Sequence, residues 1–223
     1  MPPQSVLSSG GKPPAVIAKK LLVTLAGLFI MAQGVSLFLM LGIGVDPISV
    51  FLDGMSQKGG MSFGAAQTML NVIMVALSLL FFRWNIGLST IAALFLLGPF
   101  YDIIMFFENS FITPALSPGL KILFAIAAQL CFSLGVALYQ SPEMGASPCD
   151  TPGVSISKLK GWNYGKVRIV SDGIFFICGF LLGGAAGIGT ICCVLLTGPV
   201  SQLFRPHCDR LIRRIEKGPY AKS

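Results

Sequence analysis

Two acidic residues of this sequence lie inside long apolar stretches, where a charge has to be compensated. Asp172 lies in the apolar stretch 164–182, and Asp102 lies in the apolar stretch 86–107. An ionised side chain in the middle of a lipid bilayer costs at least about 2.5 to 3.5 kcal/mol, so it needs a partner or a water-filled cavity. These two carboxylates are therefore the first candidates for binding a proton, an ion or a small polar solute.

Asp172 has two interpretations. Arg168 precedes it by four residues, so the two side chains share a helix face and could form an i,i+4 ion pair. Asn71 is also polar and occupies the matching place in the first half of the chain. Two polar side chains facing inward from corresponding positions would flank a central site, and this tilts the interpretation of Asp172 and Asn71 slightly toward function.

Asp102 follows the pair Gly98 and Pro99. A proline within a helix frees backbone carbonyl groups, and a carboxylate one turn further on could bind a cation or a proton there. The alternative, which we favour, is that Pro99 only bends the helix and that Asp102 lies close enough to the membrane surface to be hydrated.

Two Gly/Pro segments interrupt the apolar pattern, with G-x-x-P at Gly44 to Pro47 and again at Gly145 to Pro148. Irregular backbone at membrane depth persists only where protein or a cavity surrounds it. We favour segments that re-enter the membrane from opposite faces, which would expose Asp46, Asp150 and Thr151 to a cavity. In the alternative they are surface loops with short amphipathic helices, and these three residues are turn residues or helix caps.

The composition excludes a soluble domain. Hydrophobic residues make up 54% of the 223 residues and charged residues 11%, with a mean hydropathy of +0.79, whereas soluble domains carry about 25% charged residues. Basic residues outnumber acidic ones 16 to 9, but no basic platform with interleaved aromatic residues indicates a nucleic-acid partner. No combination of nucleophile and base, phosphate-binding loop, Cys-x-x-Cys or Cys/His spacing indicates an enzyme, a cofactor or a metal site.

Six apolar runs predict an all-α, polytopic membrane bundle. The runs cover about 21–41, 63–82, 86–107, 121–139, 164–182 and 188–204, and the link 83–85 between the second and third is short. About 20 apolar residues suffice for one crossing. The expected organisation is a flexible arm (1–16), a first membrane repeat (17–107), a second (117–205) and a basic tail (206–223).

The basic residues predict the orientation of the chain. With both termini in the cytoplasm, fourteen Lys and Arg residues fall inside and only Lys58 and Lys121 outside. Cytoplasmic loops carry the excess of positive charge. This distribution favours an inner-membrane protein with six spans, whose basic tail contacts anionic headgroups of the lipid bilayer.

The two halves of the sequence match at an almost constant offset. At 101 residues Gly34 corresponds to Gly135 and each G-x-x-P to the other. After one deletion, at 100 residues, 87–90 (GLST) corresponds to 187–190 (GIGT) and Gly98-Pro99 to Gly198-Pro199. Three spans per repeat is an odd number, which predicts inverted repeats of the kind that form transporter sites at their interface. Thr90 and Thr190 at these matching positions are further candidates for a substrate or ion pathway, and in the alternative they hydrogen-bond within their own helices.

The combination of these spaced and repeated motifs resembles the YczE/YyaS/YitT group of bacterial integral membrane proteins over residues 20–205. The resemblance implies a multi-pass inner-membrane protein and neither an activity nor a set of functional residues. The residues themselves favour a transporter or permease for a small polar solute or ion. The alternatives are a substrate-binding subunit energised by a separate ATPase, and a non-transporting factor that organises a partner enzyme. A homodimer is compatible with the small-residue faces.

Overall fold

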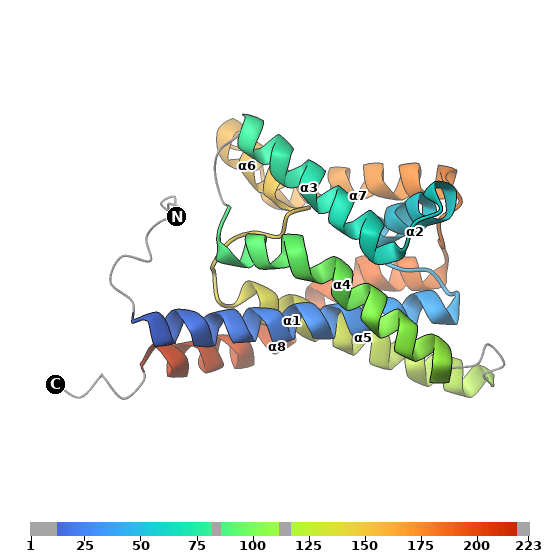
Figure 1. Cartoon of the computed structure of the whole chain (residues 1–223), viewed down its shortest axis with the longest axis horizontal. Coiled ribbons are helices and arrows are strands. Elements are labelled where there is room, and N and C mark those ends of the chain that lie inside the picture. The colour runs from blue at the N-terminus through green and yellow to red at the C-terminus, as the bar shows by residue number, and fades with distance from the viewer. Residues whose placement is uncertain (1–12, 82–85, 112–116, 218–223) are drawn as a thin grey trace.

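The computed structural model describes residues 13–81, 86–111 and 117–217, and all regular secondary structure in these ranges is α-helical (Figure 1). Residues 1–12, 82–85, 112–116 and 218–223 lie outside the described residues, and with them most of the predicted flexible arm and the predicted short link at 83–85. The helices are α1 (Pro14–Leu41), α2 (Pro47–Gly59), α3 (Phe63–Phe81), α4 (Leu88–Phe111), α5 (Pro118–Gln140), α6 (Thr151–Lys160), α7 (Tyr164–Leu181) and α8 (Ile188–Glu216).

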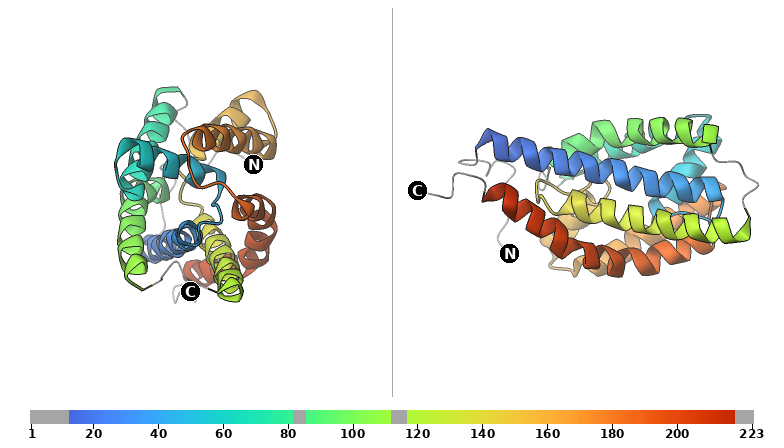
Figure 2. Two further views of the ribbon diagram at one scale, coloured as in Figure 1. Left: turned by 90° about the vertical axis from the view of Figure 1, so that its right-hand side faces the viewer. Right: turned by 90° about the horizontal axis from the view of Figure 1, so that it is seen from below.

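The order of helix lengths occurs twice. A long helix, a short helix and two long helices form α1 to α4, and the same order recurs in α5 to α8. In Figure 1, α1, α4 and α7 run in one direction along the bundle, whereas α3, α5 and α8 run in the other. Each long helix of the first half is therefore antiparallel to its counterpart in the second, and viewed end-on the long helices surround the centre of the bundle (Figure 2).

Five helices, α1, α3, α4, α5 and α8, are long and apolar enough to cross a membrane. Their outward surfaces carry large apolar side chains, such as Leu80, Phe106 and Leu203, that leave more than 70% of their area exposed. Such surfaces suit lipid and not water. The sixth predicted span, α7, has 18 residues but carries Lys166, Arg168 and Asp172, so apolarity alone does not identify it.

α1 and α5 pack closely against each other, and glycines bring the two backbones together. A Cβ atom added at Gly34 would lie 2.5 Å from the backbone nitrogen of Phe132, and one added at Gly135 would lie 2.4 Å from that of Met31. Small residues permit such close helix approach in membranes, where packing drives helix association. Gly34 and Gly135, which correspond in the two repeats, thus lie on opposite sides of the same contact between α1 and α5.

Two helices are longer than the sequence predicts. Residues 14–16, assigned to the flexible arm, are the first turn of α1, since Pro14 is a favourable first helical residue. The last helix does not end near residue 204 but continues through Pro206 to Glu216, and Cys208 and Ile212 on this extension are buried. Glu216 forms an ion pair of 2.7 Å with Lys20 of α1, so the extension packs against the start of the chain.

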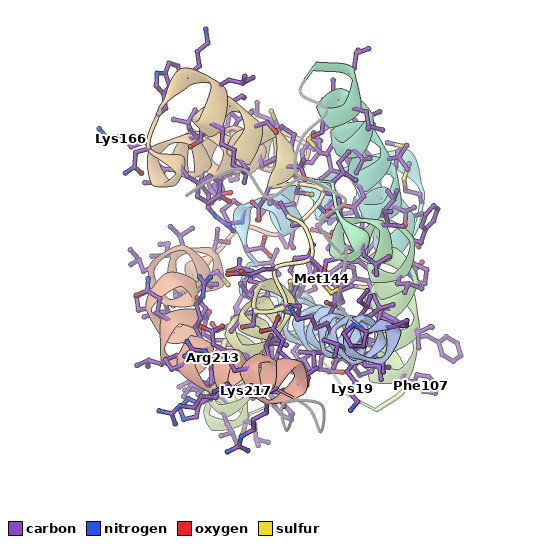
Figure 3. The ribbon with its side chains drawn as sticks, turned by 90° about the vertical axis from the view of Figure 1, so that its left-hand side faces the viewer. Lys19, Phe107, Met144, Lys166, Arg213 and Lys217 are labelled. Carbon is purple, nitrogen blue, oxygen red and sulfur yellow. The ribbon has the colours of Figure 1, made fainter. Side chains whose placement is uncertain are left out.

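Basic residues gather at the end of the bundle where α1 begins and α8 ends. Lys19 lies in the first part of α1, Lys166 in the first turn of α7, and Arg213 and Lys217 at the end of α8. Figure 1 shows these helix ends on one side of the bundle, and Figure 3 looks onto that side. Figure 1 shows α2 and the first turn of α5, which carry Lys58 and Lys121, at the opposite end. The charges are therefore distributed between the two ends as the sequence predicts.

We expect Gly135→Ala to lower the free energy of unfolding by about 1 to 3 kcal/mol, because its methyl group would overlap the backbone of α1. The matched control is Gly173→Ala in α7, where a Cβ atom meets open space and helix propensity predicts no loss. Denaturation of the purified protein in detergent measures both. Equal stabilities of the two variants would contradict the close crossing of α1 and α5.

Candidate functional site

The two Gly/Pro segments lie inside the bundle. Val45 and Val50 are completely buried in the first, and Pro148 and Thr151 in the second. Figure 3 shows Met144, at the start of the second segment, in the middle of one end of the bundle. The alternative of surface loops is therefore wrong for these residues, although each segment does lead into a short helix, α2 or α6.

Each segment binds the first turn of the last helix in the other half. The N–H group of Gly189 donates to the carbonyl oxygen of Ile43 at 2.7 Å, and that of Ser89 donates to the carbonyl oxygen of Met144 at 3.1 Å. These two hydrogen bonds occupy corresponding positions in the repeat. They satisfy backbone groups that would otherwise be unpaired inside the protein.

Glycine is required on both sides of these contacts. Gly44 and Gly145 have φ angles of 96° and 132°, which L side chains rarely adopt. A Cβ atom at Gly44 would lie 2.4 Å from the backbone nitrogen of Gly187, and one at Gly145 would lie 2.8 Å from that of Gly87. The glycines of the two G-x-x-P motifs, Gly44 and Gly145, thus pack against the glycines of the other repeated motif, Gly187 and Gly87.

The hydroxyl groups of Thr90 and Thr190 form hydrogen bonds with backbone groups at these contacts. As the structural interpretation predicts, each residue hydrogen-bonds within its own helix start: the N–H groups of Gly87 and Gly187 donate to their Oγ1 atoms at 3.1 and 3.3 Å. Thr90 also donates to the carbonyl oxygen of Ala146 in the second segment, at 2.6 Å. Thr90 therefore joins the two halves as well as capping α4.

Beside the segments lies a group of charged side chains, which we call the central cluster: Asp46, Asp150, Arg168 and Asp172. Arg168 Nη1 lies 3.3 Å from Asp150 Oδ2, and Arg168 Nε lies 3.7 Å from Asp172 Oδ2. The i,i+4 pair considered for Asp172 is thus present. Asp150 precedes α6 without capping it, so its carboxylate is available to Arg168.

Asp46 combines a structural role with an unsatisfied oxygen. Its Oδ2 accepts a hydrogen bond of 3.3 Å from the N–H group of Ser49 and so caps α2, whereas its Oδ1 is buried without a partner among the described residues. Burial raises the pKa of Asp46, while the bond from Ser49 and the charge of Arg168 oppose that rise. The helix-cap interpretation therefore accounts for only one of its two oxygens.

Asn71 is completely buried and fully engaged. Its amide donates to the carbonyl oxygen of Ala93 at 3.2 Å, and its Oδ1 accepts from Gln67 at 2.8 Å and from the Cys149 thiol at 3.5 Å. Burial raises the pKa of Cys149 to about 12, so this thiol is neutral at physiological pH and acts as a donor. Asn71 thus connects α3, α4 and the second segment, directly beside Asp150.

Asp102 lies outside the central cluster. Its carboxylate accepts hydrogen bonds from Ser62 Oγ at 2.8 Å and from the N–H group of Gly64 at 2.9 Å, which caps the start of α3. A carboxylate is favourable at a helix N-terminus. Thr151 is also structural, since it donates to the carbonyl oxygen of Ser147 at 2.8 Å and holds the turn into α6.

Several polar residues near the segments escaped the sequence analysis. Tyr164 lies 3.4 Å from Arg168, and together with Cys149 and Phe175 it lines the pocket beside Asp150 and Asp172. Tyr139 is buried and its hydroxyl has no partner among the described residues. Tyrosine and cysteine are common in apolar helices, so nothing in the sequence distinguished them.

A buried carboxylate at a different place was also overlooked. Glu108 of α4 is 8% exposed and accepts hydrogen bonds from Gln33 and Ser36 of α1. This side chain joins two helices with both of its oxygens satisfied. In the described part of the chain, no group of three His, Cys, Asp or Glu residues is arranged to hold a metal ion.

Comparison with known proteins identifies relatives that are themselves uncharacterised. The family described as a family of unknown function (DUF6198) matches residues 18–206. The uncharacterized membrane protein YczE of Bacillus subtilis is 32% identical over 84% of this chain and 86% of its own, and the uncharacterized protein YyaS of the same species is 27% identical over 82% and 91%. No solved structure matches. The resemblance to the YczE and YyaS proteins is confirmed.

We expect Thr90→Val to lower the free energy of unfolding by about 1 to 3 kcal/mol. The change removes the hydroxyl that donates to the carbonyl oxygen of Ala146 and accepts from the N–H group of Gly87. The control is Thr68→Val, which loses only a bond to Gly64 within its own helix. Thermal unfolding in detergent measures both. If Thr68→Val costs as much as Thr90→Val, the contact between the halves contributes nothing to stability.

Proposed function

The chain belongs to the DUF6198 family and is a multi-pass membrane protein, and we propose that it is a transporter or permease for a small polar solute or ion and not an enzyme. The observation that carries the proposal is the central cluster. Partly buried charged side chains meet there beside two non-helical segments, and ionisable groups inside membrane proteins commonly mark the path of a substrate or an ion.

The arrangement of α7 supports a sixth crossing. Its charged residues Arg168 and Asp172 line the pocket. Its exposed side chains are apolar along most of its length: Ile169, Val170, Ile174, Ile177, Phe180 and Leu181. A helix with an apolar outer face and a polar inner face suits a span that borders an internal site.

Several observations support inverted repeats. The helix order recurs, corresponding long helices run in opposite directions (Figure 1), and equivalent backbone bonds join each segment to the other half. Inverted repeats with broken segments permit alternating access, in which one half moves against the other around a central site. With the basic end of the bundle in the cytoplasm, both termini lie on the cytoplasmic side of the bacterial inner membrane.

The first test is a thermal-stability screen of the detergent-purified protein against ions, amino acids, vitamins and nucleobases. A ligand at 100 times its Kd adds about 2.7 kcal/mol to the stability of the folded state. We expect a hit that Asp172→Asn loses and that Asp209→Asn, a carboxylate variant on the C-terminal part of α8, retains. Uptake of the same solute into liposomes completes the test.

Absence of transport by folded protein, for every solute that binds and under every ion gradient, would refute the proposed function. If Asp172→Asn transports the solute as the wild type does, then transport does not depend on the central cluster. That result would leave this cluster as a structural ion-pair network.

Cysteine labelling tests the inverted topology. Ser49 and Thr151 are buried, whereas Lys58 after the first segment and Lys160 after the second are exposed. In a background without the six native cysteines, we expect an impermeant maleimide to label Lys58→Cys from outside the cell and Lys160→Cys only after the membrane is opened. Labelling of both from one side would contradict the inversion.

A further inference from the structure

Two glycines form the contact between α3 and α4. A Cβ atom added at Gly64 would overlap the carbonyl oxygen of Gly98, and one added at Gly98 would overlap that of Gly64. Both glycines are buried. Asp102 of α4 belongs to the same contact, because its carboxylate caps the start of α3 through Ser62 and Gly64. Close packing and a hydrogen-bonded cap thus hold α3 against α4.

Both glycines recur in the second half, where they make no such contact. Gly165 matches Gly64 at the offset of 101 residues, and Gly198 matches Gly98 at 100. Gly165 and Gly198 are exposed. A Cβ atom at Gly198 would meet nothing within 4 Å, and one at Gly165 would meet only the side chain of Asn163 in its own turn. Among the described residues, α7 has almost no contact with α8.

The two halves also differ in how α3 and α7 are capped. Asp102 of α4 caps α3, whereas α7 is capped locally by Asn163, whose Oδ1 accepts from the N–H group of Gly165 at 2.9 Å. Gln202 of α8 matches Asp102 at the offset of 100 residues and is exposed. An amide oxygen accepts the same N–H groups as a carboxylate does, so α8 carries a cap for α7 that the present conformation does not use.

An exposed glycine within a helix needs a physical reason. It costs about 0.5 to 1 kcal/mol relative to alanine, and in the present conformation no close packing at Gly198 offsets this cost. A close helix approach would offset it, as small residues do between membrane helices. In inverted-repeat transporters one half moves against the other around a fixed site, and two halves of matched construction can exchange their arrangements.

We propose that the chain has a second conformation, in which α7 packs against α8 through Gly165 and Gly198 and Gln202 contacts the start of α7. The contact between α3 and α4 opens in exchange. This inference rests on the proposed transport function, since alternating access requires two conformations. α7 begins at the basic end of the bundle, and α3 begins beside α2 at the opposite end (Figure 1). The exchange therefore closes the basic end and opens the other.

Cysteine cross-linking tests the second conformation in full-length protein without its six native cysteines. The side chains of Ser62 and Asp102 share a hydrogen bond of 2.8 Å, and their counterparts are Asn163 and Gln202. Both counterparts are exposed, so their replacement leaves the present fold intact. We expect copper phenanthroline to form a disulfide within one chain of Asn163→Cys/Gln202→Cys, measured as the loss of two maleimide-reactive thiols in the monomer.

Matched variants provide the controls. Asn163→Cys/Leu195→Cys places the second cysteine seven residues earlier in α8, about 10 Å along the helix, and should form no disulfide. Gly198→Val, added to the first pair, should lower the disulfide yield about 10-fold, because its side chain occupies the proposed contact. Gly173→Val should not, because Val72 already holds the matching position of α3. Gly173 and Gly198 both meet open space now, so both valine variants should fold.

Two results would overturn the second conformation. One is the absence of a disulfide in Asn163→Cys/Gln202→Cys under conditions that oxidise Ser62→Cys/Asp102→Cys. The other is a disulfide that joins two copies of the chain, since Gly198 would then face a partner in a homodimer.

Transport assays separate this inference from the proposed function. A disulfide that depends on Gly198, in a protein that moves no solute into liposomes, would uphold the second conformation and refute transport. We expect oxidised Ser62→Cys/Asp102→Cys to stop uptake of a solute found in the thermal screen, and a reductant to restore it. Uptake by the oxidised variant at the wild-type rate would leave transport intact and overturn the exchange.

Discussion

Backbone groups inside a lipid bilayer must find their hydrogen bonds within the protein, and the rest of this structure depends on how two non-helical segments meet that constraint. The carbonyl oxygens of Ile43 and Met144 accept hydrogen bonds from the first turns of α8 and α4. Glycines on both sides allow the backbones to approach closely enough. Each half of the chain thereby completes the other, and neither segment could be buried in a half that stood alone.

The same segments bring charge into the bundle. Asp46 and Asp150 lie at the starts of α2 and α6, so placing these segments inside the bundle also brings their carboxylates into a partly buried position. Arg168 compensates part of that charge from α7, which explains why α7 carries a charged residue beside its apolar side chains. A charged helix is tolerable here because its polar face borders the cluster and its apolar face is turned outward.

The sequence analysis separated structural from functional polar residues only in part. Asp172, Asn71 and Asp102 all interrupt apolar stretches, but only Asp172 belongs to the central cluster. Asp102 caps α3, and Asn71 is satisfied by α4 and by the second segment. Tyr139 raised no expectation, because a tyrosine in an apolar stretch has the same appearance in a sequence whether it faces lipid, core or solute.

Composition and the spacing of residues determined much of this protein by themselves. Apolar length determines the membrane helices, and the two G-x-x-P motifs determine where the chain leaves the helix, because glycine and proline control the backbone locally. Only the tertiary structure decided which side chains share a site. Gly44 meets Gly187, and Asp150 meets Arg168, through folding that brings distant segments together, and no local pattern encodes such a contact. The end of α8 was decided in the same way, since the helix continues past Pro206 to where Cys208 and Ile212 are buried and Glu216 pairs with Lys20 of α1.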